Sequence, residues 1–564
     1  MLNTPAILQT KLDALNLTQI INEPTRYNPK SVNTGTLIDV ILTNLPSKYT
    51  SAVFNQDLSD HCLIACIRNG SAVKRPPLIT VKRSLKHFCE QAFLFDLAGV
   101  SWNDIDLIPS VDDAFLTILN KHAPLKKCRT RNRYSPRFTP DLSVLDQHKN
   151  ILWRSALASN SPCDMQLFME VRNKYTQAVR KAKASFFKQK FASCSTNSKK
   201  LWDTVKSMEN KSTSSQLQPA LRLGNIVTTN KSTIIENFNK HFSTAGHAFH
   251  MVTPTSVNCP APSTATRQSP HHFSFTQIQI AYVLKELQNL DPYKSAGLDN
   301  LGPLFLKLSA EIVATPFTSL FNLSFVSCEI PKETKAVESA AVIPLFKGDD
   351  TLDPNCYRPI SILPCLSKVF KSQVNKQITD HFGSHHTFSA MQSGFRAGHG
   401  CTSATLKVLN DIITAIDKRH YCAAVFIDLA KAFDSVNHKI LIGRLDSLGF
   451  SNDCLAWFTN YFSDRVQCVK SEGLLSGPLT VSMGVPQGSI LGPTLFSVYI
   501  NDVALAAGDS LIHLYADDTI LYTSGPSLDT VLTNLQMSFN AIQLSFRGLQ
   551  LLLNASKTKC MLFN

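Results

Sequence analysis

The pattern of apolar residues along the chain predicts both helices and strands. From Met165 to Phe191 apolar side chains recur at helical spacing and basic residues occupy much of the remaining surface, which predicts an amphipathic helix with a cationic side. Cys422–Ala430 is an apolar run typical of a buried strand, and Thr494–Ala506 is helix-like. Two apolar runs within Leu511–Tyr522 predict a β-hairpin with an acidic pair near its tip.

A change of composition divides the chain. Residues 251–270 contain four Pro and seven Ser/Thr, which is typical of a linker. Helix and strand patterns continue after it to the end, so residues 271–564 are expected to form one unit. Before it, residues 1–68 contain short β-prone runs, residues 69–140 form a basic connecting region, and residues 141–250 form a helical basic region.

Composition and charge narrow the class of protein. With 564 residues, 44% of them hydrophobic and 17% charged, the chain is neither a disulfide-stapled miniprotein nor a disordered or fibrous one. The net charge is +14, and Lys121–Lys200 alone contain 18 Lys/Arg against 4 Asp/Glu, a difference of 14. Two interpretations of the basic side of the helix within this stretch are open: it faces solvent, or it contacts phosphates. The local excess of positive charge favours the phosphate contact.

Compartment signals point to the inside of the cell. No apolar run reaches the roughly 18–20 residues that cross a bilayer, and the N-terminal stretch lacks the features of a signal peptide. None of the fifteen cysteines forms a C-x-x-C pair, so zinc ribbons and redox motifs lack their spacing. We expect a soluble, non-secreted protein of the nucleus or cytoplasm without a membrane partner; Lys126–Arg133 would allow nuclear import.

Three aspartates stand at the ends of predicted strands. Asp428 lies near the end of the apolar run Cys422–Ala430. Asp517 and Asp518 lie between the two apolar runs of the predicted hairpin. Taken singly, each is typical of a turn or cap. If these strands are neighbours, the three carboxylates converge. Two carboxylates about 4 Å apart repel each other by about 4 kcal/mol at an effective dielectric constant near 20. Protonation, solvation or a cation relieves this repulsion, and Mg²⁺ prefers oxygen ligands.

These segments resemble the reverse transcriptases of non-LTR (LINE-type) retrotransposons. The resemblance rests first on FIDLAKAFDSVNH (Phe426–His438), GVPQGSILGP (Gly484–Pro493) and YADD (Tyr515–Asp518), in that order. Upstream segments resemble the fingers of the family: SAGLDNLGPLFLK (Ser295–Lys307), VIPLFKGDD with NCYRPISILPCLSKVF (Val342–Phe370) and QSGFRAGHGCTSA (Gln392–Ala404). The resemblance implies an α+β right-hand polymerase fold, with an antiparallel palm sheet packed on helices, and fingers. Because 46 residues follow Asp518 (564 − 518), we expect no thumb.

The resemblance also implies an activity and a site. The activity is RNA-directed DNA polymerisation, with an RNA template, a DNA primer and dNTPs as partners. Asp428, Asp517 and Asp518 would bind two Mg²⁺ ions, with Mn²⁺ as an alternative, for two-metal phosphoryl transfer. The remaining implied contacts are to the nucleotide: Lys347 and Arg358 with the triphosphate, Phe433 with the ribose 2′ position, Gln487 and Gly488 beside the base and template, and Lys557 near the leaving pyrophosphate. Core packing remains open for Phe433, and a surface ion pair for Lys347 and Arg358.

The N-terminal residues resemble the last third of the endonuclease of such elements, from the exonuclease–endonuclease–phosphatase family. The matching segments are Pro24-Thr25-Arg26, LIDVILT (Leu37–Thr43) and LSDHCLI (Leu58–Ile64). The resemblance implies that His61 acts at a scissile phosphate, with Asp39 orienting it and Asp60 nearby. The part of that fold that contributes the metal-binding Glu is missing from this sequence, so we expect no nuclease activity.

Three alternatives stay open at this point. The first is a nucleic-acid-binding fragment that keeps the fold and the charge without turnover. The second is an RNA-templated RNA polymerase, against which Phe433 argues. The third is a maturase-type reverse transcriptase, which the endonuclease-like segment disfavours. The sequence does not determine the oligomeric state.

Overall fold

The computed structural model describes most of the chain, and the chain divides into two compact units, Met1–Pro77 and Leu78–Asn564. None of the described helices is both long and apolar enough to cross a membrane. The predicted linker falls almost wholly outside the described residues, as do Asp60 and Arg133. The described residues are 12, 15, 17–27, 35–54, 61–68, 79–102, 109–129, 139–159, 161–194, 200–202, 204–205, 220–247, 270–330 and 340–563.

The first unit consists of short antiparallel strand pairs. Its longest pair joins β5 (Tyr49–Phe54) to β6 (Leu63–Arg68). Side chains along β5 alternate between half-buried and exposed, as expected for a strand with one covered face. The other elements are β1 (Thr18–Gln19) paired with β4 (Leu42–Thr43), β2 (Arg26–Tyr27) paired with β3 (Gly35–Thr36), and the 3₁₀ turn η1 (Pro46–Lys48).

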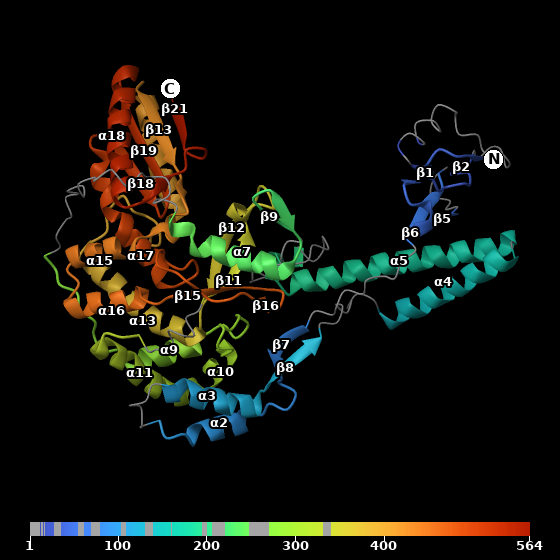
Figure 1. Cartoon of the computed structure of the whole chain (residues 1–564), viewed down its shortest axis with the longest axis horizontal. Coiled ribbons are helices and arrows are strands. Elements are labelled where there is room, and N and C mark those ends of the chain that lie inside the picture. The colour runs from blue at the N-terminus through green and yellow to red at the C-terminus, as the bar shows by residue number, and fades with distance from the viewer. Residues whose placement is uncertain are drawn as a thin grey trace. The chain divides into compact units, whose positions relative to one another are not determined.

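The second unit contains a four-stranded antiparallel sheet (Figure 1). Its order is β18 (Leu511–Tyr515), β19 (Asp518–Gly525), β13 (Tyr421–Ile427) and β21 (Lys559–Phe563). The hairpin predicted within residues 511–522 is therefore confirmed, with its turn at Ala516 and Asp517.

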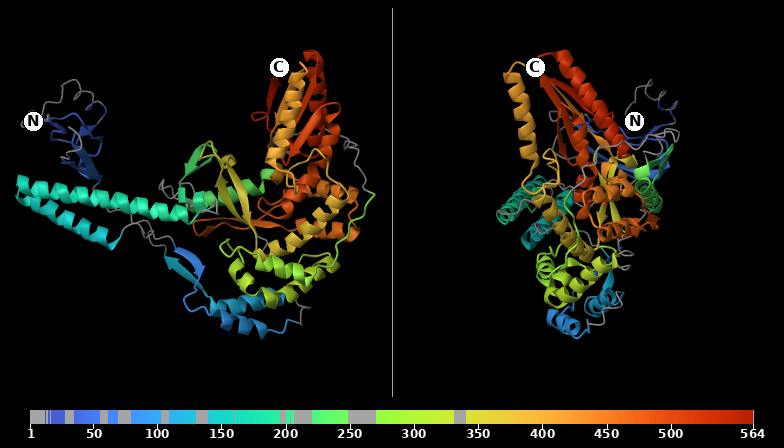
Figure 2. Two further views of the ribbon diagram at one scale, coloured as in Figure 1. Left: turned by 180° about the vertical axis from the view of Figure 1, so that it is seen from behind. Right: turned by 90° about the vertical axis from the view of Figure 1, so that its left-hand side faces the viewer.

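Both faces of this sheet are covered, which explains why β13 is apolar without alternation. On one face of β13, Cys422 and Ala424 pack against α14 (Cys401–Asp417). On the other face, Ala423 and Val425 belong to the main core, to which α18 (Leu528–Gly548) also contributes. Figure 2 shows the sheet between these two helices.

A second sheet has the order β12 (Tyr357–Ile362), β11 (Ala340–Phe346), β15 (Val466–Ser471) and β16 (Leu474–Leu475), with β17 (Leu479–Thr480) also paired to β15. Helix α7 (Lys231–Ser243) packs on it through Ile234, Phe238 and Phe242, which contact a cluster that includes Val342 and Val469. The hairpin β9 (Leu221–Leu223) and β10 (Ile226–Thr228) precedes α7, and the turn η2 (Ala245–His247) follows it.

This packing differs from the expected separation of residues 141–250 from residues 271–564. The apolar face of α7 is buried by β9 and by strands that follow residues 251–270, so residues 221–247 share a core with these later strands. Residues 69–140 likewise contribute Phe93 and Leu97 of α2 (Glu90–Ala98) and Phe115 and Leu119 of α3 (Pro109–His122) to the main core. The linker therefore connects segments that pack together.

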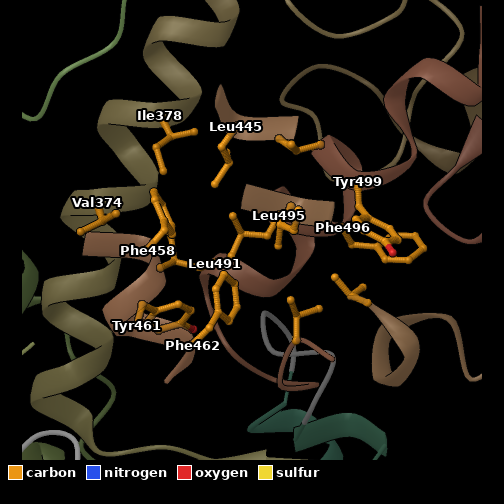
Figure 3. Packing of buried hydrophobic residues seen from close by; sticks show 14 of the residues in the cluster. Val374, Ile378, Leu445, Phe458, Tyr461, Phe462, Leu491, Leu495, Phe496 and Tyr499 are labelled. Carbon is orange, nitrogen blue, oxygen red and sulfur yellow. The ribbon is translucent and has the colours of Figure 1, made fainter. Parts of the chain in front are cut away.

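The main core is centred on α17 (Leu491–Ile500), all of whose residues except Pro493 are buried. Figure 3 shows Leu491, Leu495, Phe496 and Tyr499 of this helix among side chains of three neighbouring helices. These neighbours are α13 (Cys365–Ser384), α15 (His438–Ser447) and α16 (Asn452–Phe462). The helix predicted at 494–506 thus begins earlier, and beyond Ile500 it tightens into the 3₁₀ segment η5 (Asn501–Ala507).

The remaining elements complete the second unit. Helices α4 (Pro140–Ser159) and α5 (Pro162–Ala192) pack against each other, with the rings of Trp153 and Phe168 4.7 Å apart. The others are β7 (Ile79–Arg83) paired with β8 (Leu125–Arg129), α9 (Ile280–Gln288), α10 (Pro303–Leu308), α11 (Ala310–Ser327), η3 (Pro354–Cys356), β14 (Leu429–Ala430) paired with β20 (Leu552–Leu553), and η4 (Ala432–Ser435).

Candidate functional site

The three predicted aspartates lie at the same end of two adjacent strands. In the register of β13 and β19, Ile427 is opposite Thr519, so the residues that come next toward this end are Asp428 and Asp518. Asp517 occupies the turn that joins β18 to β19. Antiparallel pairing therefore brings together residues about 90 positions apart in the sequence.

The turn that carries Asp517 is supported from a distant segment. Ala516 has a left-handed backbone (φ 57°), and its N–H donates to Oε1 of the fully buried Gln392. The same oxygen accepts from the N–H of Gly394 at 2.8 Å. A Cβ at Gly394 would lie 2.2 Å from the backbone nitrogen of Ala516, so only glycine fits there.

The carboxyl group of Asp517 has a raised pKa. Burial raises the pKa of its carboxyl above the ordinary value, and the negative charges of Asp518 and Asp428 raise it further. Arg358 acts in the opposite direction and lowers the pKa of Asp517. Among the described residues, no group of three or more His, Cys, Asp or Glu side chains is already arranged to hold a metal ion. The aspartates are thus close enough to repel one another but do not form a preformed cage.

Asp428 is held by the segment that follows β20. Its Oδ2 accepts from Nδ2 of Asn554 at 2.8 Å, and its backbone carbonyl accepts from the N–H of the same residue at 2.8 Å. Its own N–H donates to Thr558 Oγ1 at 3.3 Å. Lys557 is exposed within this turn, between the two residues that contact Asp428.

A second group of predicted residues lies around η4 and the glycine-rich loop. Nε2 of Gln487 donates to both carboxylate oxygens of Asp434, each at 3.0 Å. Gly488 has φ 99°, and a Cβ there would lie 3.0 Å from the carbonyl oxygen of Ser361 on β12. The half-buried ring of Phe433 stacks on Phe496 at 4.4 Å, so core packing accounts for part of its environment.

The two predicted finger cations lie on the β11–β12 hairpin and are both exposed. Arg358 pairs with Leu345 across the two strands, and its charge lowers the pKa values of both Asp517 and Asp434. Lys347 follows β11, and its N–H donates to the carbonyl of Cys356 at 2.9 Å. Electrostatics therefore connect Arg358, but not Lys347, to the aspartates.

In the first unit, Asp39 and His61 form a pair. Nδ1 of His61 lies 2.8 Å from Oδ2 of Asp39. The hydrogen bond from His61 lowers the pKa of Asp39, and a bond from the buried Thr25 adds to this effect. Thr25 Oγ1 also accepts from the backbone N–H groups of Ile38 and Asp39, which fixes the loop.

Sequence reasoning missed four residues of the second unit: Gln392, Gly394, Asp434 and Asn554. Gln392 and Gly394 lie in QSGFRAGHG, a segment quoted for its resemblance but without a role for these residues. Asp434 follows Phe433 directly in AFDSVNH, and Asn554 begins the segment NASKTK. For Gln392, Gly394 and Asp434 the available signal was their position inside a quoted motif.

Comparison with known proteins finds a family match in the C-terminal part of the chain. Residues 343–562 match the family model described as Reverse transcriptase (RNA-dependent DNA polymerase). The chain is 28% identical over 529 residues to the "Probable RNA-directed DNA polymerase from transposon BS" of Drosophila melanogaster, covering 89% of this chain and 57% of that protein. It is 25% identical over 573 residues to the "RNA-directed DNA polymerase from mobile element jockey" of the same species, covering 95% of this chain and 60% of the relative.

A further jockey polymerase, from Drosophila funebris, is 31% identical over 269 residues, or 46% of this chain and 29% of that protein. A solved apo telomerase from Candida Tropicalis, truncated from its C-terminal domain, matches with a TM-score of 0.27 and 14% identity over 37% of this chain and 48% of that one. Residues 343–562 thus match a reverse transcriptase model, and the chain spans less than two thirds of the length of these curated relatives.

Proposed function

We propose that this chain is the RNA-directed DNA polymerase of a non-LTR retrotransposon and adds dNTPs to a DNA 3′ end on an RNA template. One observation carries the proposal: Asp428, Asp517 and Asp518 lie at one end of adjacent strands inside the region that matches the reverse transcriptase model. The four-stranded sheet would then be the palm, and the β11–β12 hairpin part of the fingers. The names of the relatives agree with this activity.

The donor set at the strand ends fits a divalent cation. Carboxylate oxygens are the ligands that Mg²⁺ prefers, and the raised pKa of Asp517 reflects burial and negative neighbours that a cation would neutralise. We therefore assign Asp428, Asp517 and Asp518 to Mg²⁺, with Mn²⁺ as an alternative. When bound, the metal supplies charge neutralisation at the phosphate and activation of the attacking oxygen.

The chain's own side chains would handle the nucleotide. Arg358 offers a planar fork of donors that suits the triphosphate, and Lys347 on the same hairpin adds a point charge. Phe433 would crowd the ribose 2′ position, while Gln487 and Gly488 would face the base and template. Lys557 would lie near the leaving pyrophosphate, since its turn also contacts Asp428.

Helix α5 supports a nucleic-acid partner. Its C-terminal part, residues 171–192, contains seven Lys/Arg and no Asp/Glu, and all seven are exposed. From Arg172 to Lys190 these cations extend over about 27 Å of helix, at a rise of about 1.5 Å per residue. Phosphate contacts of this kind weaken with salt. We therefore assign this surface to the nucleic-acid backbone.

Primer extension on an RNA template tests the activity. We expect Mg²⁺-dependent dNTP incorporation by the wild type and its loss in Asp517→Asn, which keeps the side-chain volume. Asp411→Asn is the matched control, because Asp411 is a half-buried carboxylate that accepts only from Tyr522 in the described structure. Equal incorporation by wild type and Asp517→Asn would refute the assignment. RNA binding without any incorporation would instead select the non-catalytic fragment.

The α5 assignment has its own test. Replacing Arg180, Lys181 and Lys183 by Gln should weaken binding to duplex RNA and reduce the slope of log K against log salt by about two to three. The control replaces the exposed Lys285, Lys418 and Lys439 by Gln, which removes the same net charge elsewhere. Identical slopes for both triple variants would exclude α5 as the contact surface.

The Asp39–His61 pair supports the proposed kinship of residues 1–68 with the C-terminal part of an endonuclease. The carboxylate orients the imidazole, as such a site requires. The described residues around the pair include no group that could hold a metal ion. We make no proposal about nuclease activity.

A further inference from the structure

Asp434 lies where three segments distant in the sequence meet. It belongs to η4, and its backbone carbonyl is packed against Gly246 of η2 and Gly484 of the glycine-rich loop. A Cβ at Gly246 would lie 2.3 Å from the carbonyl oxygen of Asp434, and one at Gly484 would lie 2.8 Å from it. A side chain at either glycine would displace Asp434. The backbone of Asp434 is therefore fixed by close contact on two sides.

Main-chain hydrogen bonds also join η4 and the residues beside it to the glycine-rich loop. The N–H of Val485 donates to the carbonyl of Phe433 at 2.8 Å, and the N–H of Gly484 donates to that of Val436 at 2.8 Å. On the far side of the loop, the N–H of Ser361 donates to the carbonyl of Gln487 at 2.8 Å. The backbones of Asp434 and Gln487 thus have little freedom to move apart.

The hydrogen bonds between the side chains of Asp434 and Gln487 fix which end of the Gln487 amide faces Asp434. A carboxylate only accepts hydrogen bonds, whereas an amide has a donating and an accepting end. Because both oxygens of Asp434 face the Gln487 amide, an ionised Asp434 admits only the orientation with Nε2 inward. Burial raises the pKa of Asp434 to about 6, and the charges of Lys431 and Arg358 oppose this rise, so the carboxylate is mainly ionised at neutral pH. The carbonyl Oε1 of Gln487 then remains turned away from Asp434.

We propose that Asp434 is a positioning residue that holds the Gln487 amide with its acceptor oxygen presented to the incoming nucleotide. The inference rests on the proposed function, in which Gln487 faces the nucleotide. The proposed site also includes a segment outside the region that matches the reverse transcriptase model. This segment is η2, which precedes residue 343 and contacts the backbone of Asp434. Asp434 itself makes no contact with substrate in this proposal.

A double-mutant cycle tests whether Asp434 acts through Gln487. We expect Asp434→Asn, whose amide no longer enforces one orientation, to raise KM for dNTP about tenfold with a smaller change in kcat. In a Gln487→Met background the same substitution should leave KM unchanged, because there is no amide to orient. Asp411→Asn is the control and should leave KM unchanged in both backgrounds. Independent, multiplying effects of Asp434→Asn and Gln487→Met would overturn the proposal.

A glycine variant tests the same contact without touching a polar group. Gly246→Ala must displace the Asp434 carbonyl, so it should also raise KM for dNTP. The control is Gly443→Ala in α15, where an added Cβ meets nothing within 4 Å. An unchanged KM in Gly246→Ala, with thermal unfolding like that of the wild type, would contradict the proposed clamp.

An NMR measurement keeps the inference separate from the activity. In protein labelled with ¹⁵N-glutamine, the side-chain amide protons that disappear in Gln487→Met should be hydrogen-bonded and slow to exchange in the wild type. Asp434→Asn should shift them and speed their exchange, whether or not the enzyme incorporates dNTP. Unchanged resonances in Asp434→Asn would overturn the positioning role even if primer extension succeeds. Absent primer extension with shifted resonances would instead refute the proposed function alone.

Discussion

The two carboxylate sites of the chain differ in what surrounds the negative charge. Asp39 in the first unit accepts hydrogen bonds from His61 and Thr25, and its pKa is lowered. Asp517 in the second unit is half-buried beside two other aspartates, and its pKa is raised. The first charge is already compensated by the protein. The second is compensated only in part, by a backbone hydrogen bond and by the charge of Arg358. Partial compensation of this kind is the condition under which a site attracts a cation.

The largest effect is expected from Gly394→Ala, which disturbs the uncompensated site without changing its charge. The added Cβ would lie 2.2 Å from the nitrogen of Ala516, so the turn carrying Asp517 must move. Because small misplacements of catalytic groups are costly, we expect incorporation to fall roughly hundredfold. Primer extension measures this.

Gly383→Ala in α13 is the control for this variant, because an added Cβ there meets nothing within 4 Å. It should retain full incorporation and gain roughly 0.5–1 kcal/mol of stability, as Ala favours a helix over Gly. Equal incorporation by both variants would show that the turn tolerates displacement.

A medium effect is expected on stability and should have opposite signs at the two sites. Without metal, Asp517→Asn should raise the free energy of unfolding of the second unit, because it removes a buried and repelled charge. Asp39→Asn should lower that of the first unit. Addition of Mg²⁺ at about 100 times its Kd should stabilise the wild type by about 2.7 kcal/mol and leave Asp517→Asn unchanged.

Two probes separate these measurements. All four tryptophans (Trp102, Trp153, Trp202 and Trp457) belong to the second unit, so their fluorescence follows its unfolding. Hydrogen exchange of residues 35–68 follows the first unit. A destabilised Asp517→Asn in the absence of metal would contradict the contrast between the sites.

The smallest effect is expected from pH. A lowered pKa means that Asp39 stabilises the fold above its ordinary value of 3.8 and that this contribution is lost as the pH falls through the lower folded value. The raised pKa of Asp517 means that ionisation costs stability above the folded value, and this cost disappears as the pH falls toward 3.8. The difference between wild type and Asp39→Asn should therefore vanish at lower pH than that for Asp517→Asn. Denaturant unfolding between pH 3 and 8 measures both, and coinciding pH windows would contradict the opposite shifts.

Local sequence patterns predicted the strands that carry the three aspartates. The contacts that support the turn between β18 and β19 come from residues distant in the sequence. The hairpin at 511–522 and the strand ending near Asp428 follow from runs of apolar residues, which depend on neighbours in the sequence. That Gln392 and Gly394 support the hairpin turn depends on a contact across more than 100 residues. The spacing of apolar residues along the chain does not predict such a contact.

The position of α7 shows the same limit. A Pro-, Ser- and Thr-rich segment predicted a boundary after residue 250, and this segment lies almost wholly outside the described residues. Which surface buries Phe238 and Phe242 is decided by the shape of the second sheet. The link between Gly246 and Asp434, and through it the orientation of Gln487, could therefore be read only from the structure.

The pairing of β13 with β21 has a consequence for handling the protein. Five residue pairs, from Cys422 with Phe563 to Phe426 with Lys559, give β13 its second neighbour. A shortened chain that stops before Lys559 would leave the amide and carbonyl groups of this apolar strand as an open edge. Such an edge recruits strands from other molecules, so we expect the shortened chain to aggregate more readily than the full one.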